Sequence, residues 1–422
     1  MKTIRILSKI LFFALLIFDI AVFGAVFYLT DYIGEDFKIK KGESLNINSP
    51  LPVTAIYNGS QVDSGLTSNQ IGCFDVDLKM FGIIPFSTAQ VQVVDRMHVV
   101  VLGKPFGMKL YTKGVLVVDA TDVPTEQGNL NPATEGGIKV GDYILSVNSK
   151  KISTNEDLLE IVENSGGQKM EFKISRDGEQ MTVYLTPVLS KENGQYKIGI
   201  WVRDSSAGIG TLTFYSPMTN IVCGLGHGVS DKETGELLTL ESGEIVTAEI
   251  YDVQKGEKGT AGQLKGHFTS KTLGNILLNC EGGVYSKATG KFAFDSLTEI
   301  ALKSEVENGK AQILCTVDGT EPQLYDCKIS IKKGNFNAKT QNMIITVTDQ
   351  RLLETTGGIV QGLSGSPILQ NGKLVGAVTH VLLDDSTKGY GIFAENMLET
   401  ANEVGTGVLD CPQDNQQLKN AS

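Results

Sequence analysis

The organisation of this 422-residue chain is decided by one stretch near its C-terminal end, Gly357-Gly358-Ile359-Val360-Gln361-Gly362-Leu363-Ser364-Gly365-Ser366-Pro367-Ile368. Ser364 is flanked there by Gly362 and Gly365, and glycine permits backbone conformations that a Cβ would forbid. Backbone N–H groups at such a turn can converge and stabilise an oxyanion. The stretch therefore has the composition of a turn that presents a nucleophilic serine, and an ordinary glycine–serine loop between strands is the alternative.

The residues after this turn predict a β-hairpin. Asn371-Gly372 lies between two apolar runs, and this dipeptide is a strong signal for a two-residue hairpin turn. A serine on a glycine-rich turn that leads into a hairpin is typical of chymotrypsin-like proteases.

Composition favours a β-rich globular protein of two or three domains. The chain contains 47 glycines, few aromatic residues and many short Val/Ile/Thr segments. A net charge of −11 and a pI near 5.0 argue against a nucleic-acid partner, which requires a basic face. The six cysteines include no C-x-x-C pair, so we expect neither a zinc site nor a cofactor. Cys315 and Cys327 could pair in an oxidising compartment, and free buried thiols are the alternative.

Residues 1–30 predict a membrane anchor. Three basic residues precede an apolar run from Ile10 to Leu29, about the 20 residues that cross a bilayer core. Asp19 within the run costs about 3 kcal/mol. Fourteen Leu, Ile, Phe and Val residues, at roughly −0.4 kcal/mol each, outweigh it. The charge pattern places residues 31–422 on the extracytoplasmic side. A cleaved signal peptide is the alternative.

Four further segments follow the anchor. We expect a small β region at 31–98, a PDZ domain at 99–190, a peptidase domain at 191–400 and a frayed polar tail at 401–422. The many short strands after residue 191, without crossover helices, favour an antiparallel barrel or sandwich. The predicted fold is therefore mainly β, with an N-terminal transmembrane helix, a PDZ domain and a chymotrypsin-like antiparallel β-barrel.

The PDZ prediction depends on residues 131–148, which read N-P-A-T-E-G-G-I-K-V-G-D-Y-I-L-S-V-N, and on the helix expected after them. Ser153 and Thr154, followed by Glu156 and Asp157, form a capping-box signature. This order resembles a PDZ domain of the bacterial protease type. The resemblance implies that the apolar-Gly-apolar loop Phe106-Gly107-Met108 offers N–H groups to a peptide carboxylate, and that a neighbouring strand edge pairs with the peptide. A domain used only for packing is the alternative.

A serine nucleophile requires a general base, and histidine is the natural one near neutral pH. His227 is our candidate because Gly224, Gly226 and Gly228 surround it at the end of an apolar strand, which would expose it at a barrel rim. His380, which ends the strand after the nucleophile turn, is the rival, although a wall residue is its more natural role.

A third group should orient the histidine and stabilise its cation. Asp349, at the end of a strand-like segment fifteen residues before Ser364 (364 − 349), is our candidate, and Asp231 is its rival. The resulting order, His227, Asp349, Ser364, is the order of chymotrypsin-like enzymes, although their aspartate usually lies further upstream. We expect the backbone N–H groups of Gly362, Leu363 and Ser364 to form the oxyanion hole.

Three motifs carry a closer resemblance: R-D-S-S-A-G-I-G-T-L-T-F-Y at 203–215, G-L-G-H-G-V-S-D at 224–231 and the segment 348–381 around Ser364. With a PDZ domain and an N-terminal anchor, the chain resembles the stage IV sporulation protein B family of signalling serine peptidases. The resemblance assigns the histidine, aspartate and serine roles to His227, Asp349 and Ser364. It implies cleavage of a membrane-bound regulator between the mother cell and forespore membranes. That cleavage releases an intramembrane protease that processes a sigma factor, and the family also cleaves itself.

The residue before the nucleophile is Leu363, where trypsin-like enzymes have an aspartate that pairs with a newly formed N-terminus. Control by that ion pair is therefore not expected. Ser366 is the rival nucleophile, but the Gly-x-Ser-Gly frame favours Ser364. Two other functions stay open: a tethered PDZ scaffold with an inactive barrel, and a general extracytoplasmic quality-control protease.

Overall fold

The computed structural model describes residues 2–407 apart from 34–35, 44, 46, 48, 58–59, 62–70, 258, 291, 293–295 and 333–337. The chain divides into two compact units, Met1–Met97 and His98–Ser422. Most of the predicted polar tail, from 408 onward, lies outside the described residues. Its first part is not frayed, because residues 401–406 belong to the last helix.

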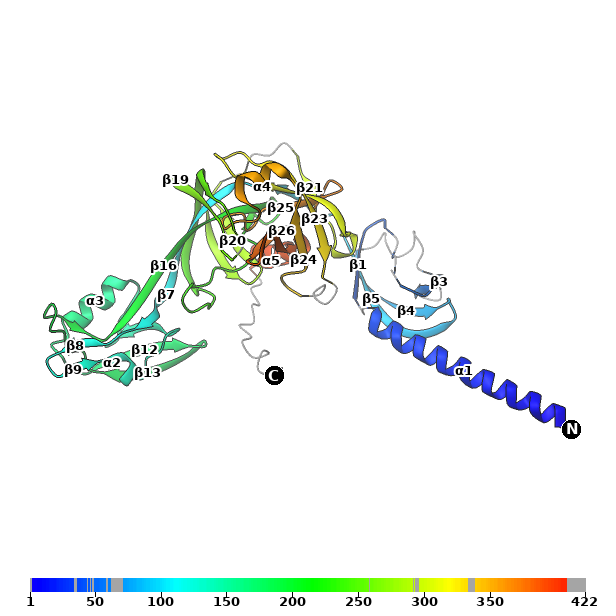
Figure 1. Cartoon of the computed structure of the whole chain (residues 1–422), viewed down its shortest axis with the longest axis horizontal. Helices are drawn as coiled ribbons and strands as arrows, with labels where there is room; N and C mark the ends of the chain where they lie inside the picture. Colours follow the sequence, from blue (N-terminus) through cyan, green and yellow to red (C-terminus); the bar gives the residue numbers. More distant parts are fainter. Residues whose placement is uncertain are drawn as a thin grey trace. The chain divides into compact units, whose positions relative to one another are not determined.

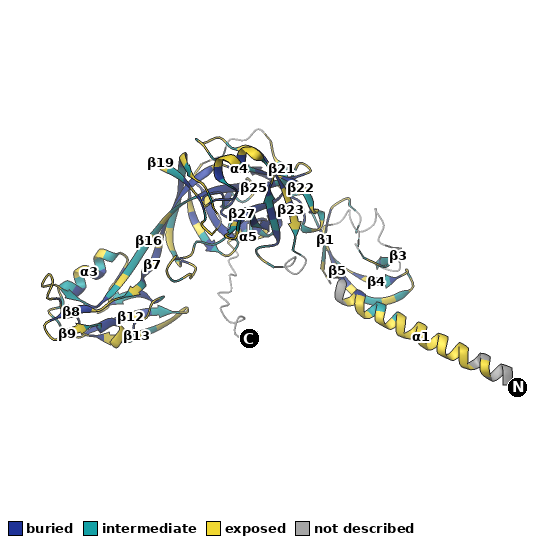
Figure 2. Ribbon diagram, viewed as in Figure 1, coloured by how far each residue is buried: buried dark blue, intermediate teal, exposed yellow. Residues whose placement is uncertain are grey.

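The first unit combines a long apolar helix with one small sheet. Its elements are α1 (Lys2–Tyr32), β1 (Asp36–Lys40), β2 (Val53–Tyr57), β3 (Ser60–Gln61), β4 (Gly72–Met80) and β5 (Ile84–Val94), with sheet order β1-β5-β4-β2-β3. Most of α1 is exposed (Figure 2), and Lys9–Thr30, with mean hydropathy 2.7, is long and apolar enough to cross a membrane. Leu29 and Ile33 pack into the core of the sheet. The helix fits an anchor and a signal sequence equally.

A first barrel begins the second unit. Its strands are β7 (Pro105–Ala120), β16 (Ile200–Ser216), β17 (Ile221–Gly224), β18 (Leu240–Gln254), β19 (Gln263–Cys280) and β20 (Gly283–Ala288), and β6 (His98–Val101) pairs with the end of β16. The order β7-β18-β19-β20-β17-β16 closes into a ring because β16 also pairs with β7. The core of this barrel includes Phe106, Leu110, Leu212 and Val284.

The PDZ elements are nested between β7 and β16. They are β8 (Val123–Thr125), β9 (Gly128–Leu130), α2 (Pro132–Glu135), β10 (Tyr143–Val147), β11 (Lys150–Lys151), α3 (Asn155–Glu163), β12 (Met170–Arg176), β13 (Glu179–Leu185), β14 (Val188–Leu189) and β15 (Tyr196–Lys197). Thr154 and Asp157 form the predicted capping box of α3. Figure 1 shows β7 and β16 running together from these elements to the barrel, with Ile200 paired to Ala120 at one end and Thr211 to Pro105 at the other.

The second barrel holds the glycine-rich turn around Ser364. It closes in the order β22 (Gly309–Cys315), β23 (Gln323–Ile331), β24 (Met343–Val347), β27 (Asp385–Phe393), β26 (Lys373–Leu382) and β25 (Pro367–Gln370). A 3-10 turn at Lys303–Glu305, α4 (Gln350–Thr356) and α5 (Ala394–Thr406) accompany this barrel. Strand β21 (Thr298–Glu299) pairs with β6 and so extends the sheet of the first barrel. The predicted hairpin turn is confirmed, because Asn371 and Gly372 have φ values of 52° and 76°.

Two expectations are corrected by this architecture. Phe106-Gly107-Met108 is not a loop of the PDZ domain, because all three residues pair with β16 on one side of β7 and with β18 on the other. Phe106 and Met108 point into the first barrel, where both are buried. The possible pairing of Cys315 with Cys327 is not formed, since both are free buried thiols whose pKa is raised chiefly by desolvation.

Candidate active site

Ser364 lies on the turn between α4 and β25, which only glycine can build at two positions. Gly362 and Gly365 have φ values of +101° and +94°. A Cβ added to Gly365 would lie 1.9 Å from the carbonyl oxygen of Thr211 in β16. The turn of the second barrel therefore presses directly on a strand of the first, and the glycine pattern of the sequence reflects this contact.

The backbone N–H groups of the turn point in different directions. Leu363 donates to the Val360 carbonyl at 3.1 Å, and Gly365 donates to Val378 at 2.7 Å. The N–H groups of Gly362 and Ser364 donate to no acceptor in the described part of the chain. Of the three predicted oxyanion donors, two are therefore available, and Leu363 is already engaged.

The Ser364 hydroxyl donates to the carbonyl oxygen of Thr379 in β26 at 2.5 Å. The Thr379 side chain is buried, and its own hydroxyl oxygen has no partner among the described residues. The rival Ser366 is fully buried, and its hydroxyl donates to the Leu363 carbonyl at 2.6 Å. Ser364 is the more accessible of the two serines.

His227 is brought to the same strand by a tight turn after β17. Leu225 and Gly226 have φ values of 67° and 68°, and a Cβ on Gly226 would lie 3.1 Å from Thr379 Cγ2. The His227 Nδ1 lies 2.8 Å from the Gly228 carbonyl oxygen, which can only accept, so Nδ1 carries the proton and Nε2 is left as a base. Desolvation lowers the pKa of His227, which favours this neutral form.

His380 belongs to the same site. Its ring stacks on His227 with centroids 4.4 Å apart and planes inclined by 32°. Although His380 reaches solvent, desolvation of its ring and the charge of His227 lower its pKa to about 4. Both imidazoles are therefore neutral near pH 7, and both rings lie beside the Thr379 segment that accepts the serine hydroxyl.

Neither candidate aspartate is hydrogen-bonded to His227 in the described part of the chain. Asp349 caps α4 and pairs with Arg351 at 2.8 Å, and hydrogen bonds from Arg351 hold the pKa of its carboxyl at about 2. Asp231 is buried and pairs with Arg203, and it accepts N–H groups of its own turn. Asp231 therefore caps this turn.

Sequence reasoning did not single out the threonines around the serine. Thr211 and Thr213 in β16 and Thr379 in β26 are buried. The hydroxyl groups of Thr211 and Thr213 donate to backbone carbonyls of the nucleophile turn, and the Thr379 carbonyl accepts from the Ser364 hydroxyl. The sequence contains one indication of this role: Thr211 and Thr213 are two residues apart on a strand and so share one face.

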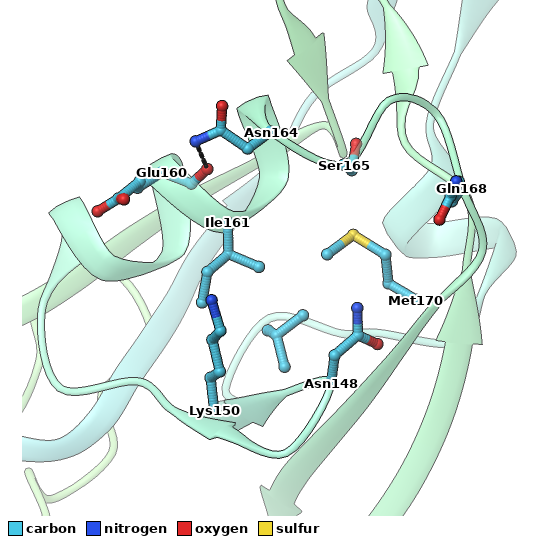
Figure 3. Close-up of a pocket in the computed structure, with 9 residues that line it drawn as sticks. Asn148, Lys150, Glu160, Ile161, Asn164, Ser165, Gln168 and Met170 are labelled. Carbon is cyan, nitrogen blue, oxygen red and sulfur yellow. Dashed lines mark hydrogen bonds between the residues drawn. The ribbon is translucent and has the colours of Figure 1, made fainter.

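The PDZ unit contains a separate pocket of about 230 Å³, between α3 and the end of the β10–β11 hairpin. Figure 3 shows Glu160, Ile161 and Asn164 of α3 on one side and Lys150 and Met170 on the other, with an Asn164 side-chain hydrogen bond to the Glu160 carbonyl. None of the predicted catalytic residues lines it.

Comparison with known families decides the identity of the second unit. Residues 194–398 match the family model described as SpoIVB peptidase S55, and residues 131–176 match that of a PDZ domain. The peptidase region belongs to the SpoIVB peptidase S55 family. The fold of the chain is mainly β, with a PDZ domain and an N-terminal apolar helix.

Curated relatives share shorter parts of the chain. A Bartonella henselae protein whose name places it among zinc metalloproteases is 32% identical over 81 residues, 19% of this chain and 22% of that protein. The regulator of sigma-W protease RasP of Bacillus subtilis is 24% identical over 167 residues, 37% and 40% of the two chains. The S55 chain spans between 22% and 31% of the length of the first three relatives.

Two solved structures are similar at low identity. The PDZ domain of an SdrC-like protein from Listeria monocytogenes shares 16% identity, with a TM-score of 0.18 and coverage of 21% of this chain and 87% of that domain. The thermostable serine protease AL20 shares 13% identity, with a TM-score of 0.30 and coverage of 48% and 92%.

Proposed function

We propose that Ser364 is the nucleophile of this S55 peptidase and His227 its general base. The observation that carries the proposal is the convergence of Ser364 and both histidines on Thr379. Rotation of the Ser364 hydroxyl away from the Thr379 carbonyl would direct it to His227 Nε2, which takes its proton as the hydroxyl attacks a peptide carbonyl. The N–H groups of Gly362 and Ser364 would hold the oxyanion.

The orientation of His227 is supported in this structure by the Gly228 carbonyl. We keep Asp349 as the candidate third residue on the strength of the family resemblance. Asp349→Asn separates the two assignments. If Asp349 belongs to the triad, this substitution should lower the maximal rate by orders of magnitude, as in other serine proteases. If Asp349 only caps α4, the rate should stay at the wild-type value, because asparagine caps a helix about as well as aspartate.

A fluorophosphonate probe tests the active-site assignment without a known substrate. Ser364 displaces fluoride from phosphorus, and its proton passes to His227. We expect labelling to disappear in Ser364→Ala and His227→Ala. Undiminished labelling of Ser364→Ala would overturn the assignment, and loss in His380→Ala but not in His227→Ala would exchange the histidines.

For the PDZ unit, the peptide site moves from the predicted loop to the N-terminal part of β16. Between Ile200 and Asp204, β16 pairs with β7 alone among the described strands, so its other edge is open to a peptide strand. Asn155, at the start of α3, donates its N–H to Asp204 at 2.9 Å, which holds the helix beside that edge. Leu159, one turn after Asn155 on α3, is 56% exposed and offers an apolar contact there. Trp201 lies on the opposite face of β16 from Ile200 and Val202, which pack on the same core as α3.

The biological role we infer is that of a sporulation signalling peptidase. It is tethered or secreted outside the cytoplasm, between the mother cell and forespore membranes, where it cleaves a membrane-bound regulator and itself. The family match, the PDZ domain and the apolar segment Lys9–Thr30 support this role. Co-expression with candidate regulators in membranes tests it: cleavage must depend on Ser364, and self-cleavage fragments must be absent from Ser364→Ala.

Two alternatives have distinct outcomes in the same experiments. A tethered PDZ scaffold would bind peptides without fluorophosphonate labelling. A quality-control protease would degrade casein or other unfolded proteins as readily as the regulator.

A further inference from the structure

We propose that Ser366 and Thr211 are positioning residues that hold the nucleophile turn with its two oxyanion donors facing the substrate. The inference rests on the proposed function, because it concerns the same serine. It follows from the directions in which the carbonyl groups of the turn are held.

The two available donors are the N–H groups of Gly362 and Ser364. Each belongs to a peptide group whose carbonyl oxygen accepts a hydrogen bond. In a trans peptide the C=O and the following N–H point in opposite directions. The Leu363 carbonyl accepts hydrogen bonds from the Ser366 hydroxyl at 2.6 Å and from its N–H at 3.0 Å, so the Ser364 N–H must point the other way. The Gln361 carbonyl accepts from the Leu264 N–H at 2.8 Å, which directs the Gly362 N–H in the same manner.

Thr211 fixes the plane between these two. Its hydroxyl donates to the Gly362 carbonyl at 2.8 Å, and its N–H donates to the Ser364 carbonyl at 2.9 Å. Thr213 adds a bond from its hydroxyl to the Gly365 carbonyl at 2.7 Å. The peptide planes Gly362–Leu363, Ser364–Gly365 and Gly365–Ser366 are therefore held by β16, a strand of the first barrel, whereas the turn belongs to the second.

Burial makes these bonds decisive. Thr211, Thr213 and Ser366 are at most 1% exposed, so water cannot replace a lost hydroxyl. A buried carbonyl that loses a donor is unfavourable. Loss of the Ser366 hydroxyl leaves the Leu363 carbonyl with the Ser366 N–H alone, and rotation of that plane would carry the Ser364 N–H out of the oxyanion position. Loss of the Thr211 hydroxyl frees the Gly362–Leu363 plane, whose rotation would displace the two donor planes that adjoin it. No side chain of the set need touch the substrate, which makes them positioning residues.

The test measures the rate of fluorophosphonate labelling of the full chain as a function of pH. We expect Thr211→Val and Ser366→Ala to lower the maximal rate at least about tenfold, less than the roughly hundredfold loss of a whole oxyanion donor. The midpoint of the pH profile should stay at the wild-type value, because His227 is untouched. Thr211→Ser, which restores the hydroxyl, should recover most of the rate.

The matched control is Thr112→Val. Thr112 is also buried, and its hydroxyl donates to the Gly114 carbonyl at 2.7 Å, with the Asp204 carbonyl as the alternative acceptor at 3.0 Å, both away from the turn. It should lower the melting temperature without changing the labelling rate. If Thr211→Val does not fold, Ser366→Ala carries the test, since it only removes an oxygen.

Rates within twofold of wild type for folded Thr211→Val and Ser366→Ala would overturn the inference, as would a slow Thr211→Ser. A shift of the pH midpoint would also overturn it, because the lesion would then act through the base. Failure of the proposed function has a different signature, which is wild-type labelling that persists in Ser364→Ala.

Discussion

Gly365→Ala is the sharpest test of how the nucleophile turn is built. Gly365 has φ +94°, and an added Cβ would lie 1.9 Å from the Thr211 carbonyl oxygen and 2.4 Å from the Leu225 nitrogen. Both are backbone atoms of the first barrel, so no side chain can rotate away. The turn, β16 or the His227 loop must move.

The expected loss of stability has two parts. Forcing alanine into this conformation costs about 1–3 kcal/mol. Overpacking against backbone adds roughly another 1–3 kcal/mol. The sum, about 2–6 kcal/mol, is a large part of the 5–15 kcal/mol that typically stabilises a folded domain. Labelling of Ser364 should fall far below wild type even where the variant is folded, because the displaced turn carries both oxyanion donors.

Gly372→Ala separates the cost of backbone strain from the cost of overpacking. Gly372 has φ +76° in the β25–β26 hairpin, with nothing within 4 Å of the added Cβ, so strain alone should destabilise it. Urea unfolding followed by circular dichroism, with fluorophosphonate labelling of the folded fraction, compares the variants. Equal destabilisation of Gly365→Ala and Gly372→Ala, or wild-type labelling of Gly365→Ala, would refute the close contact between the barrels.

Three further predictions concern pH, the α4 cap and the PDZ edge. The pKa values of His227 and His380 are lowered in the folded protein, so the unfolded chain binds more protons than the folded one between pH 6.5 and 4. Stability should therefore fall as the pH drops from 6.5 toward 4. His380→Phe should reduce that fall in melting curves recorded at acid pH. The carboxyl of Asp349 has a pKa of about 2, so its charge stabilises the fold above the pKa of the unfolded chain, and this stabilisation is lost as the pH falls toward 2. Arg351→Gln should make the acid-induced loss of stability smaller. If Asp349 is only a cap, this variant should be labelled as fast as wild type. Leu159→Ala should weaken peptide binding at least about tenfold, as for an interface anchor, with labelling unchanged in a gel assay.

The conformation of the turn and its hairpin could be predicted because each is encoded locally. Gly362 and Gly365 mark the positive φ values around Ser364, and Asn371-Gly372 marks the hairpin. The capping box at Thr154 likewise sets the start of α3 within four residues of sequence. These signals depend on backbone sterics, which act over a few residues.

The nesting of the PDZ domain could not be predicted, because it depends on pairing between distant segments. Pro105–Ala120 looks like a loop and two strands when read alone, yet it is one strand that pairs with β16 almost a hundred residues later. Phe106-Gly107-Met108 has the apolar-Gly-apolar composition of a PDZ loop, and also the alternation of a barrel strand. Only the partners on both sides distinguish the two.

Nesting also limits how a substrate could use both sites, if the β16 edge binds peptide as proposed. From Trp201 to Thr211, the strand advances at most about 33 Å, at roughly 3.3 Å for each of ten residues. No flexible linker joins the two sites along this path, because β7 pairs with β16 from Ala120 to Pro105. An extended substrate therefore needs about ten residues, or fewer if β16 bends, between its PDZ-bound segment and its scissile bond.

A series of peptides with spacers of two to twenty residues between a PDZ-binding segment and one cleavable site tests this geometry. The cleavage rate at low substrate concentration should rise steeply as the spacer approaches about ten residues and then decline slowly, as effective concentration falls with spacer length. Leu159→Ala should flatten the series, because cleavage would then depend on the active site alone. Equal rates at spacers of two and ten residues in the wild-type protein would contradict simultaneous binding along β16.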